Sequence, residues 1–255
     1  MTLAVLASSS SLTLVALPPE GLGIVVPARP ATAEEVFAAN PDVAAVIGGP
    51  MFGFCDGQPH DYARYDCGVV RYALADARRG VRVAGAREND ARGLTFSVVG
   101  TQLAVARGNA PAPGATVAVQ TYPGLVEDGA VAVGAPTGGP DAEVNGRVAM
   151  GVLRDGRAFF AYGRTSLRAF AERLRDAGAT WAGYTDGGGS SSLVVRDAAG
   201  ALIGVDADDP RGRRLPSWIV WAPPRGAVPW SVLLGLAGAG AVGVAALRWR
   251  RAARR

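Results

Sequence analysis

The apolar positions of this chain fall into short runs separated by Gly, Pro, Asn and Asp. Runs of this length between turn residues are typical of β-strands, and an Asp-Gly pair between two of them predicts a hairpin. Such a pair, Asp155-Gly156, separates the runs 148–153 and 158–162. The strands we predict are 12–17, 22–26, 43–47, 93–99, 102–106, 116–120, 148–153, 158–162, 181–184, 193–196, 201–205 and 216–221.

Two segments carry helix signals instead. Thr32 and Glu35 have the spacing of a capping box, and the helix that they begin should end near Asn40. A second helix should start at Thr165 or Ser166, because apolar residues then recur with helical spacing. These residues are Leu167, Phe170, Ala171 and Leu174, with Gly178 at the C-terminal cap. Many short strands with two main helices predict an α+β fold with a mixed or antiparallel sheet.

The C-terminal segment has a different pattern. Residues 227–247 carry no charge, and as a helix they would be roughly 31 Å long, close to the thickness of a bilayer core. Trp230 and Trp249 lie near its ends, and an arginine cluster follows at 248–255. These features predict one transmembrane helix in a cell membrane, with the C-terminus cytoplasmic and the preceding residues extracytoplasmic. A buried core helix is the alternative, but the arginines at its end argue against it.

The predicted organisation therefore has four parts. Residues 1–19 are an N-terminal segment read either as a strand or as a weak signal peptide, and the strand is favoured because no basic residue precedes the apolar run. Export would then need a signal upstream of residue 1, or insertion by the C-terminal helix. Residues 20–222 form the folded domain, 223–247 the linker and transmembrane helix, and 248–255 a basic cytoplasmic tail.

The net charge of +4 belongs to that tail, which holds five of the 26 arginines in the last eight residues. The remainder has 21 arginines against 22 acidic residues, so no basic surface for nucleic acid is expected. Within the apolar segment, 238–243 matches the Gly-x-Gly-x-x-Gly pattern, but no second strand can follow it, which excludes a dinucleotide site. The spacing of Gly235, Ala239 and Gly243 would let two such helices pack as a dimer, although small residues are also common in membrane helices.

Cys55 and Cys67 are the only cysteines. In an extracytoplasmic compartment they predict one disulfide, worth about 3 kcal/mol by loop closure. His60 lies between them, but one histidine and two cysteines fall short of a zinc site, so no metal or cofactor is expected. Asp206, Asp208 and Asp209 resemble a calcium loop only superficially, and a solvated turn is the simpler interpretation.

The run from Asp186 to Ser192 has the most unusual chemistry. Three consecutive glycines expose backbone amides that can converge on an anion, Ser190 and Ser191 add hydroxyls, and Asp186 adds a carboxylate. This set suits a sugar phosphate, and the alternative is a flexible hairpin tip. The run lacks the lysine of a P-loop, and no Gly-x-Ser-x-Gly elbow indicates a serine hydrolase.

The sequence Asp186-Gly-Gly-Gly-Ser-Ser after a helix and a strand resembles the hallmark of the phosphodiester glycosidase family. In the same order, 45–52 resembles that family's Asn-Gly-Gly-x-Phe turn, 120–129 its Gln-x-x-Pro-x-Leu-Val-x-x-Gly strand, and 147–151 its Arg-Thr-Ala-x-Gly element. The resemblance covers about residues 20–222. It implies a hydrolase that cleaves a sugar-1-phosphodiester without a cofactor.

The resemblance also implies the site residues. Asp186 and Arg147 would be catalytic, and the substrate would bind to Gly49, Gly187, Gly188, Gly189, Ser190 and Ser191. In this hypothesis Arg147, together with the amides and hydroxyls of 187–191, holds the phosphate, and Asp186 supplies the carboxylate. Two structural alternatives stay open. Arg147 could be an ordinary surface charge, and Asp186 could only cap the glycine turn through the backbone. Glu127 and Asp128 are candidates for a second carboxylate, although no spacing rule supports them.

Three asparagines of the family pattern are replaced here, by Gly48, Tyr184 and Ser217. Their loss is consistent with a different sugar or with lost activity. The sequence therefore leaves a second function open, that of a non-catalytic, membrane-tethered binder of a cell-surface glycan or phosphodiester polymer.

Overall fold

The computed structural model describes residues 4–9, 12–50, 52–53, 69–70, 73–83, 92–134, 141–197, 199–206 and 213–224. Its strands pair in antiparallel fashion throughout, and two α-helices accompany them, so the predicted α+β class is confirmed. Both cysteines and the apolar segment 227–247 lie outside the described residues. Within the described residues, no helix is long and apolar enough to cross a membrane.

The largest sheet has seven strands in the order β1-β2-β15-β14-β16-β12-β13. Its members are β1 (Ala4–Ser9), β2 (Leu12–Leu17), β15 (Ala158–Thr165), β14 (Asn145–Leu153), β16 (Ala179–Gly187), β12 (Gly124–Glu127) and β13 (Ala130–Val131). The strand predicted at 12–17 is therefore confirmed as β2, which pairs with β15. The Asp155-Gly156 hairpin is confirmed as the turn between β14 and β15.

Two five-stranded sheets complete the core. One has the order β18-β17-β4-β19-β3, formed by β18 (Leu202–Asp206), β17 (Ser192–Arg196), β4 (Ala45–Gly48), β19 (Trp218–Trp221) and β3 (Leu22–Val25). The other has the order β10-β9-β11-β7-β8, formed by β10 (Gln102–Arg107), β9 (Leu94–Val99), β11 (Val117–Thr121), β7 (Leu74–Asp76) and β8 (Val81–Val83). A two-stranded ribbon pairs β5 (Phe52–Gly53) with β6 (Val69–Val70).

Both helices begin where the sequence predicts. Helix α1 (Ala33–Ala39) has the capping box of Thr32 and Glu35, and Asn40 is its C-cap. Helix α2 (Leu167–Asp176) is capped by Ser166, whose hydroxyl accepts from the Ala169 amide. Gly178 follows α2 with a φ of 98°, a left-handed conformation that favours glycine at a helix end.

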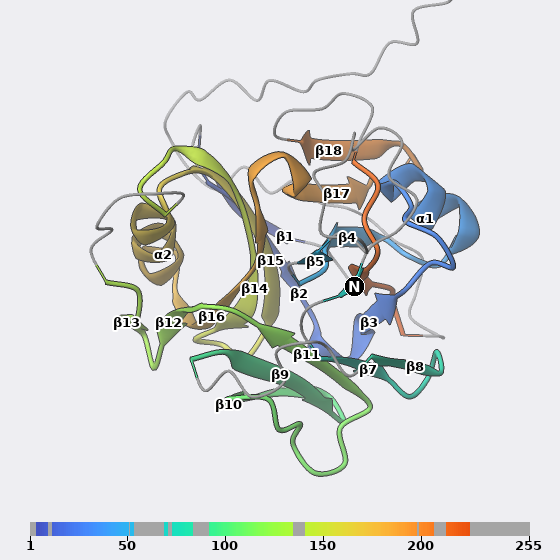
Figure 1. The fold of residues 1–255 in the computed structure, drawn as a ribbon, viewed down its shortest axis with the longest axis horizontal. Coiled ribbons are helices and arrows are strands. Elements are labelled where there is room, and N and C mark those ends of the chain that lie inside the picture. The colour runs from blue at the N-terminus through green and yellow to red at the C-terminus, as the bar shows by residue number, and fades with distance from the viewer. Residues whose placement is uncertain are drawn as a thin grey trace, which may run out of the picture.

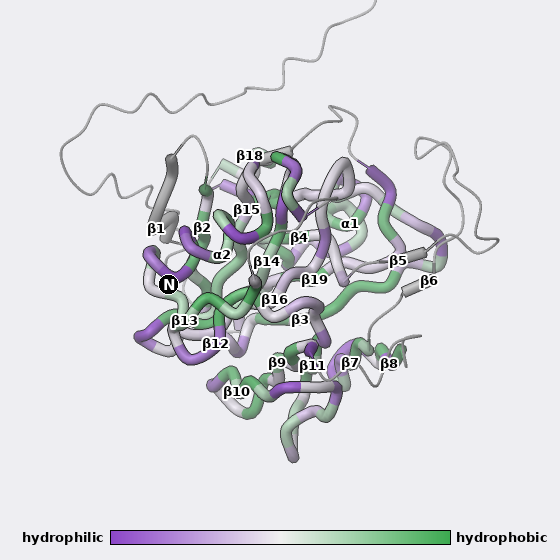
Figure 2. The backbone as a smooth tube through the Cα atoms, turned by 60° about the vertical axis from the view of Figure 1, so that its left-hand side comes forward, coloured by the Kyte–Doolittle hydropathy of each residue, from purple (hydrophilic) through white to green (hydrophobic). Residues whose placement is uncertain are grey.

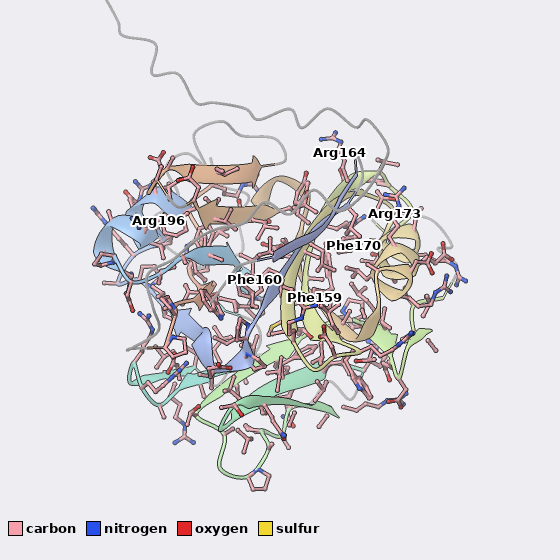
Figure 3. The ribbon with its side chains drawn as sticks, turned by 180° about the vertical axis from the view of Figure 1, so that it is seen from behind. Phe159, Phe160, Arg164, Phe170, Arg173 and Arg196 are labelled. Atoms are coloured by element: carbon pink, nitrogen blue, oxygen red, sulfur yellow. The ribbon has the colours of Figure 1, made fainter. Side chains whose placement is uncertain are left out.

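The sheets and helices stack in layers around three apolar clusters. The seven-stranded sheet has α2 on one face, and its other face looks toward the sheet of β17, β4 and β19, beyond which lies α1 (Figure 1). The sheet of β9, β10 and β11 closes one side of the central cluster, as Figure 2 also shows. Alternate residues of one strand serve different layers: Phe159 packs with Phe170 of α2, whereas Phe160 belongs to the central cluster (Figure 3).

One difference from the sequence prediction matters for function. The predicted strand 181–184 extends to Gly187, so Asp186 lies within β16 and not in the loop after it. The extension comes from pairing with β14, in which Arg147 faces Gly187 and Val148 faces Asp186. The register shifts at Thr185, which is an extra residue in β16 and therefore a β-bulge.

Candidate active site

The triple-glycine element is the crossover from one sheet to another. It leaves the seven-stranded sheet at Gly187, makes a single 3-10 turn over Gly188–Ser190, and enters the neighbouring sheet at Ser192. Gly188 has a φ of 69°, a conformation that side chains with a Cβ rarely adopt. The crossover is partly buried at its glycines and fully buried at its three serines, so the alternative of a solvent-facing hairpin tip does not fit.

Asp186 lies at the start of this crossover and is 6% exposed. Its Oδ1 accepts a hydrogen bond of 2.7 Å from the Gly187 amide. Its Oδ2 is buried and has no hydrogen-bond partner among the described residues. Burial raises the pKa of this carboxyl to about 6, against the opposing effects of the Ser190 hydroxyl, the Gly187 amide and the positive charge of Arg213. A carboxyl in this state can exchange a proton near neutral pH.

Two buried hydroxyls, like Asp186 Oδ2, lack a hydrogen-bond partner among the described residues. Ser191 is 0% exposed and Ser217 is 1% exposed, and neither Oγ has a hydrogen-bond partner within the described part of the chain. An unsatisfied buried polar group costs free energy, and native proteins keep few of them without a reason. Asp186 Oδ2 and these two hydroxyls are therefore the candidates for contact with a polar ligand.

Strand pairing and the residues that follow along the chain relate these three groups to the central cluster. Ser191 is two residues from Leu193 and Ser217 is two residues from Ile219, and both apolar residues belong to the central cluster. Asp186 is paired with Val148, which belongs to the same cluster. Asp186 is therefore on the central-cluster face of β16, and Ser191 and Ser217 directly precede two strands whose inward residues belong to that cluster.

Gly49 packs directly on Ser217. It follows β4, its amide donates to the Ser217 carbonyl over 3.0 Å, and a Cβ there would overlap with the Ser217 hydroxyl. Gly48 packs differently, because a Cβ on it would lie 3.0 Å from Leu215 and 3.3 Å from the Ser190 carbonyl oxygen. The turn at 48–49, which the sequence relates to the family pattern, thus lies against the glycine crossover.

Arg147 lies beside the crossover but on the other face of its sheet. Its guanidinium donates to the carbonyls of Thr165 (3.3 Å) and Glu143 (3.2 Å) and to the Tyr184 hydroxyl (3.1 Å), and the residue is 3% exposed. Tyr184 belongs to the cluster that packs against α2. The alternative of a surface charge does not fit these contacts, yet the guanidinium does not point into the space that Asp186 faces.

Tyr184 connects Arg147 to the crossover. A Cβ on Gly187 would overlap with the Tyr184 hydroxyl and would lie 3.3 Å from Nη1 of Arg147. Burial raises the pKa of Tyr184 to about 12, which keeps the phenol protonated. Tyr184, which stands where the family pattern has an asparagine, therefore covers Gly187, and its hydroxyl contacts Arg147.

Two backbone amides of the predicted anion site have partners within the protein. The Gly187 amide donates to Asp186, and the Ser191 amide donates to the Gly188 carbonyl over 3.1 Å. The hydroxyl of Ser190 donates to the Gly187 carbonyl over 2.9 Å. The turn is thus held together by its own hydrogen bonds, and a ligand would meet mainly Asp186 Oδ2 and the two serine hydroxyls.

The structure does not bring Glu127 or Asp128 to this place. Glu127 forms an ion pair with Arg107, and Asp128 sits in the β12–β13 turn with a φ of 48°. The Gly129 amide, next in the chain, donates to Thr180. Thr180 is six residues along β16 from Asp186, a separation of roughly 20 Å. No cluster of three or more metal-binding side chains occurs in the described residues.

Sequence reasoning missed Arg213. It lies before β19, and its charge acts on Asp186. No local pattern separates it from its neighbour Arg214, which forms an ion pair with Glu35 of α1. Only the tertiary contact distinguishes the two arginines.

Comparison with known proteins supports the resemblance. Fourteen chains of solved structures match. One is the catalytic domain of zebrafish N-acetylglucosamine-1-phosphodiester alpha-N-acetylglucosaminidase, auto-inhibited by its pro-peptide, with a TM-score of 0.60, 14% identity, and coverage of 84% of this chain and 77% of that chain. Another is a putative exported protein from Burkholderia pseudomallei, with a TM-score of 0.54, 15% identity, and coverage of 83% and 74%. At these identities they show a shared fold.

No curated protein matches this chain. The family model described as phosphodiester glycosidase matches residues 38–221, which include every element of the crossover and its surroundings. Since that match spans more than half of the sequence, this chain belongs to the phosphodiester glycosidase family.

Proposed function

We propose that this protein hydrolyses a sugar-1-phosphodiester, with Asp186 as its catalytic carboxylate. One observation supports the proposal: a buried carboxyl oxygen and two buried hydroxyls, all without partners among the described residues, lie in or beside the glycine crossover. The family match makes a glycosyl phosphodiester the expected substrate class.

The chemistry suits a site with one strong acid–base group. Water attacks C1 of the sugar, the bond between C1 and the phosphate oxygen breaks, and the phosphate monoester departs with the electron pair. The second pKa of a phosphate monoester is about 6, so this leaving group needs little help from a general acid. The carboxylate of Asp186 can accept the proton of the attacking water or stabilise positive charge at C1.

The other predicted residues have supporting roles in this proposal. Ser191 and Gly49, with Ser217 beside them, would line the place where the substrate binds, and Gly187, Gly188, Gly189 and Ser190 would shape the turn. Arg147 would act through Tyr184 by holding the crossover in position, because its guanidinium faces the α2 side.

The test is an assay of the full chain in detergent on glycosyl-1-phosphodiesters such as UDP-sugars. Asp186→Asn should lower kcat at least roughly 100-fold, a typical loss when a general acid–base group is removed. Arg147→Ala should lower activity by disturbing the crossover. Full activity in both variants would refute the assignment.

The replaced asparagines at Gly48, Tyr184 and Ser217 favour a second candidate, a non-catalytic binder of glycans or phosphodiester polymers. The same assay separates the two. Binding of a sugar phosphodiester that persists unchanged through long incubation would support the binder and contradict the hydrolase.

The membrane tether is a further part of the proposal. The uncharged length of 227–247 and the arginines after it support an anchor that holds the domain on the extracytoplasmic side. Protease added to intact cells should then remove the domain and leave the C-terminal tail protected. Protection of the domain would contradict this orientation.

A further inference from the structure

Arg213 packs directly on the glycine crossover. A Cβ built on Gly189 would lie 2.6 Å from Nη2, 3.0 Å from Cζ and 3.3 Å from Nη1 of Arg213. The guanidinium group therefore lies against the glycine, in space that any side chain at position 189 would take. The absence of a Cβ at Gly189 is what allows a positive charge to approach the turn this closely.

The same charge acts on Asp186. Arg213 opposes the rise of the carboxyl pKa that burial causes, so its guanidinium lies near enough to Asp186 for the two charges to interact. Arg213 is half-buried, and it stands four residues before Ser217, the second of the unpartnered hydroxyls. The Arg213 guanidinium is thus a neighbour both of the glycine turn and of the Asp186 carboxyl.

Arg147 and Arg214 are also near this region, but they contact other groups. Arg147 is buried on the α2 side, where carbonyl and phenol oxygens accept from its guanidinium. Arg214 turns toward α1, where it donates to Glu35 and to the Pro30 carbonyl. Of the three, Arg213 is the one that lies against Gly189 and whose charge acts on the Asp186 carboxyl.

We propose that Arg213 binds the phosphate group of the substrate, while Arg147 acts only as a positioning residue. The inference rests on the proposed function for its substrate class. A guanidinium can donate two parallel hydrogen bonds to a phosphate. A phosphodiester carries one negative charge and the monoester that leaves it carries up to two, so the interaction strengthens as the glycosidic bond breaks. Arg213 should therefore contribute to kcat as well as to binding.

The experiment uses the full chain and compares Arg213→Ala and Arg213→Lys with the matched control Arg214→Ala. Binding of inorganic phosphate is measured by titration calorimetry, without any requirement for turnover. We expect Arg213→Ala to weaken phosphate binding at least tenfold, Arg213→Lys to restore part of it, and Arg214→Ala to bind as the wild type does. On a phosphodiester substrate, Arg213→Ala should lower kcat/KM roughly 100-fold.

A second readout separates binding from a merely structural role. Asp186 is surrounded by the Ser190 hydroxyl, the Gly187 amide, Tyr184 and Arg213, and of these only Arg213 carries a positive charge. Its removal should move the acid limb of the pH–rate profile to higher pH. A structural defect that spares the charges would lower the rate without moving that limb.

The outcomes are distinct. Phosphate binding that is unchanged in Arg213→Ala would overturn the inference, as would a wild-type protein that does not bind phosphate. A wild type that binds phosphate through Arg213 but cleaves no phosphodiester would contradict the hydrolase and leave the assignment of Arg213 standing.

Discussion

Replacing Asp186 with asparagine should stabilise the protein at neutral pH. The carboxyl is 6% exposed, and burial raises its pKa from 3.8 to about 6. Keeping the group ionised at pH 7 therefore costs the folded state about 3 kcal/mol relative to the unfolded chain. Asparagine carries no charge, and its side-chain oxygen can still accept from the Gly187 amide, so the variant escapes this cost.

The sign follows from proton binding. Between pH 4 and pH 6 the folded state holds a proton on Asp186 that the unfolded state has lost, so wild-type stability falls as the pH rises through this window. The variant lacks this contribution. Its advantage should be near zero at pH 4 and should reach at most about 3 kcal/mol above pH 6. For a protein of this size that corresponds to a rise in Tm of about 6–12 °C at pH 7.5.

The assay is thermal and urea unfolding of both proteins at pH 4, 5, 6 and 7.5. Asp76→Asn is the matched control, because Asp76 is fully buried yet accepts from the amides of Ile24, Arg78 and Arg79. An amide nitrogen in place of one acceptor should destabilise that variant by about 1–3 kcal/mol. An Asp186→Asn protein that is no more stable than wild type at pH 7.5, or whose advantage does not depend on pH, would refute the reasoning.

Three further predictions concern activity, packing and the membrane. Hydrolysis should fall below about pH 6, as the Asp186 carboxylate gains a proton, and a pH–rate profile measures this; a flat profile from pH 4 to 8 would contradict a catalytic carboxylate. Gly187→Ala should lower the free energy of unfolding by about 1–3 kcal/mol and remove most activity, because its Cβ would overlap with the Tyr184 hydroxyl. As a control, Gly204→Ala should unfold at the wild-type temperature in a thermal melt, because the atom nearest to its Cβ would be 3.6 Å away. Deletion of 225–255 should move the protein from the membrane to the soluble fraction after ultracentrifugation, and continued sedimentation with membranes would argue against a C-terminal anchor.

Local signals in the sequence predicted the local structure well. The capping box at Thr32 and Glu35 specifies where α1 begins, and Asp155-Gly156 specifies the β14–β15 turn, because each involves residues close in the chain. The apolar spacing of α2 likewise reports a single buried face.

The geometry of the site could not be predicted in the same way. Which face of the sheet Arg147 and Asp186 occupy depends on pairing between β14 and β16 and on the bulge at Thr185, both of which join residues far apart in sequence. The contact of Arg213 with Gly189 spans two sheets for the same reason. The resemblance identified the crossover, but only the fold shows which side chains face it.

The crowding of Gly187 by Tyr184 restricts how these two positions can change over evolutionary time. As long as the phenol covers position 187, any larger residue there meets a steric barrier. A lineage could therefore acquire a side chain at 187 only after position 184 had become smaller. The two sites are thus expected to show sign epistasis, with the order of the exchanges deciding whether the intermediate protein folds.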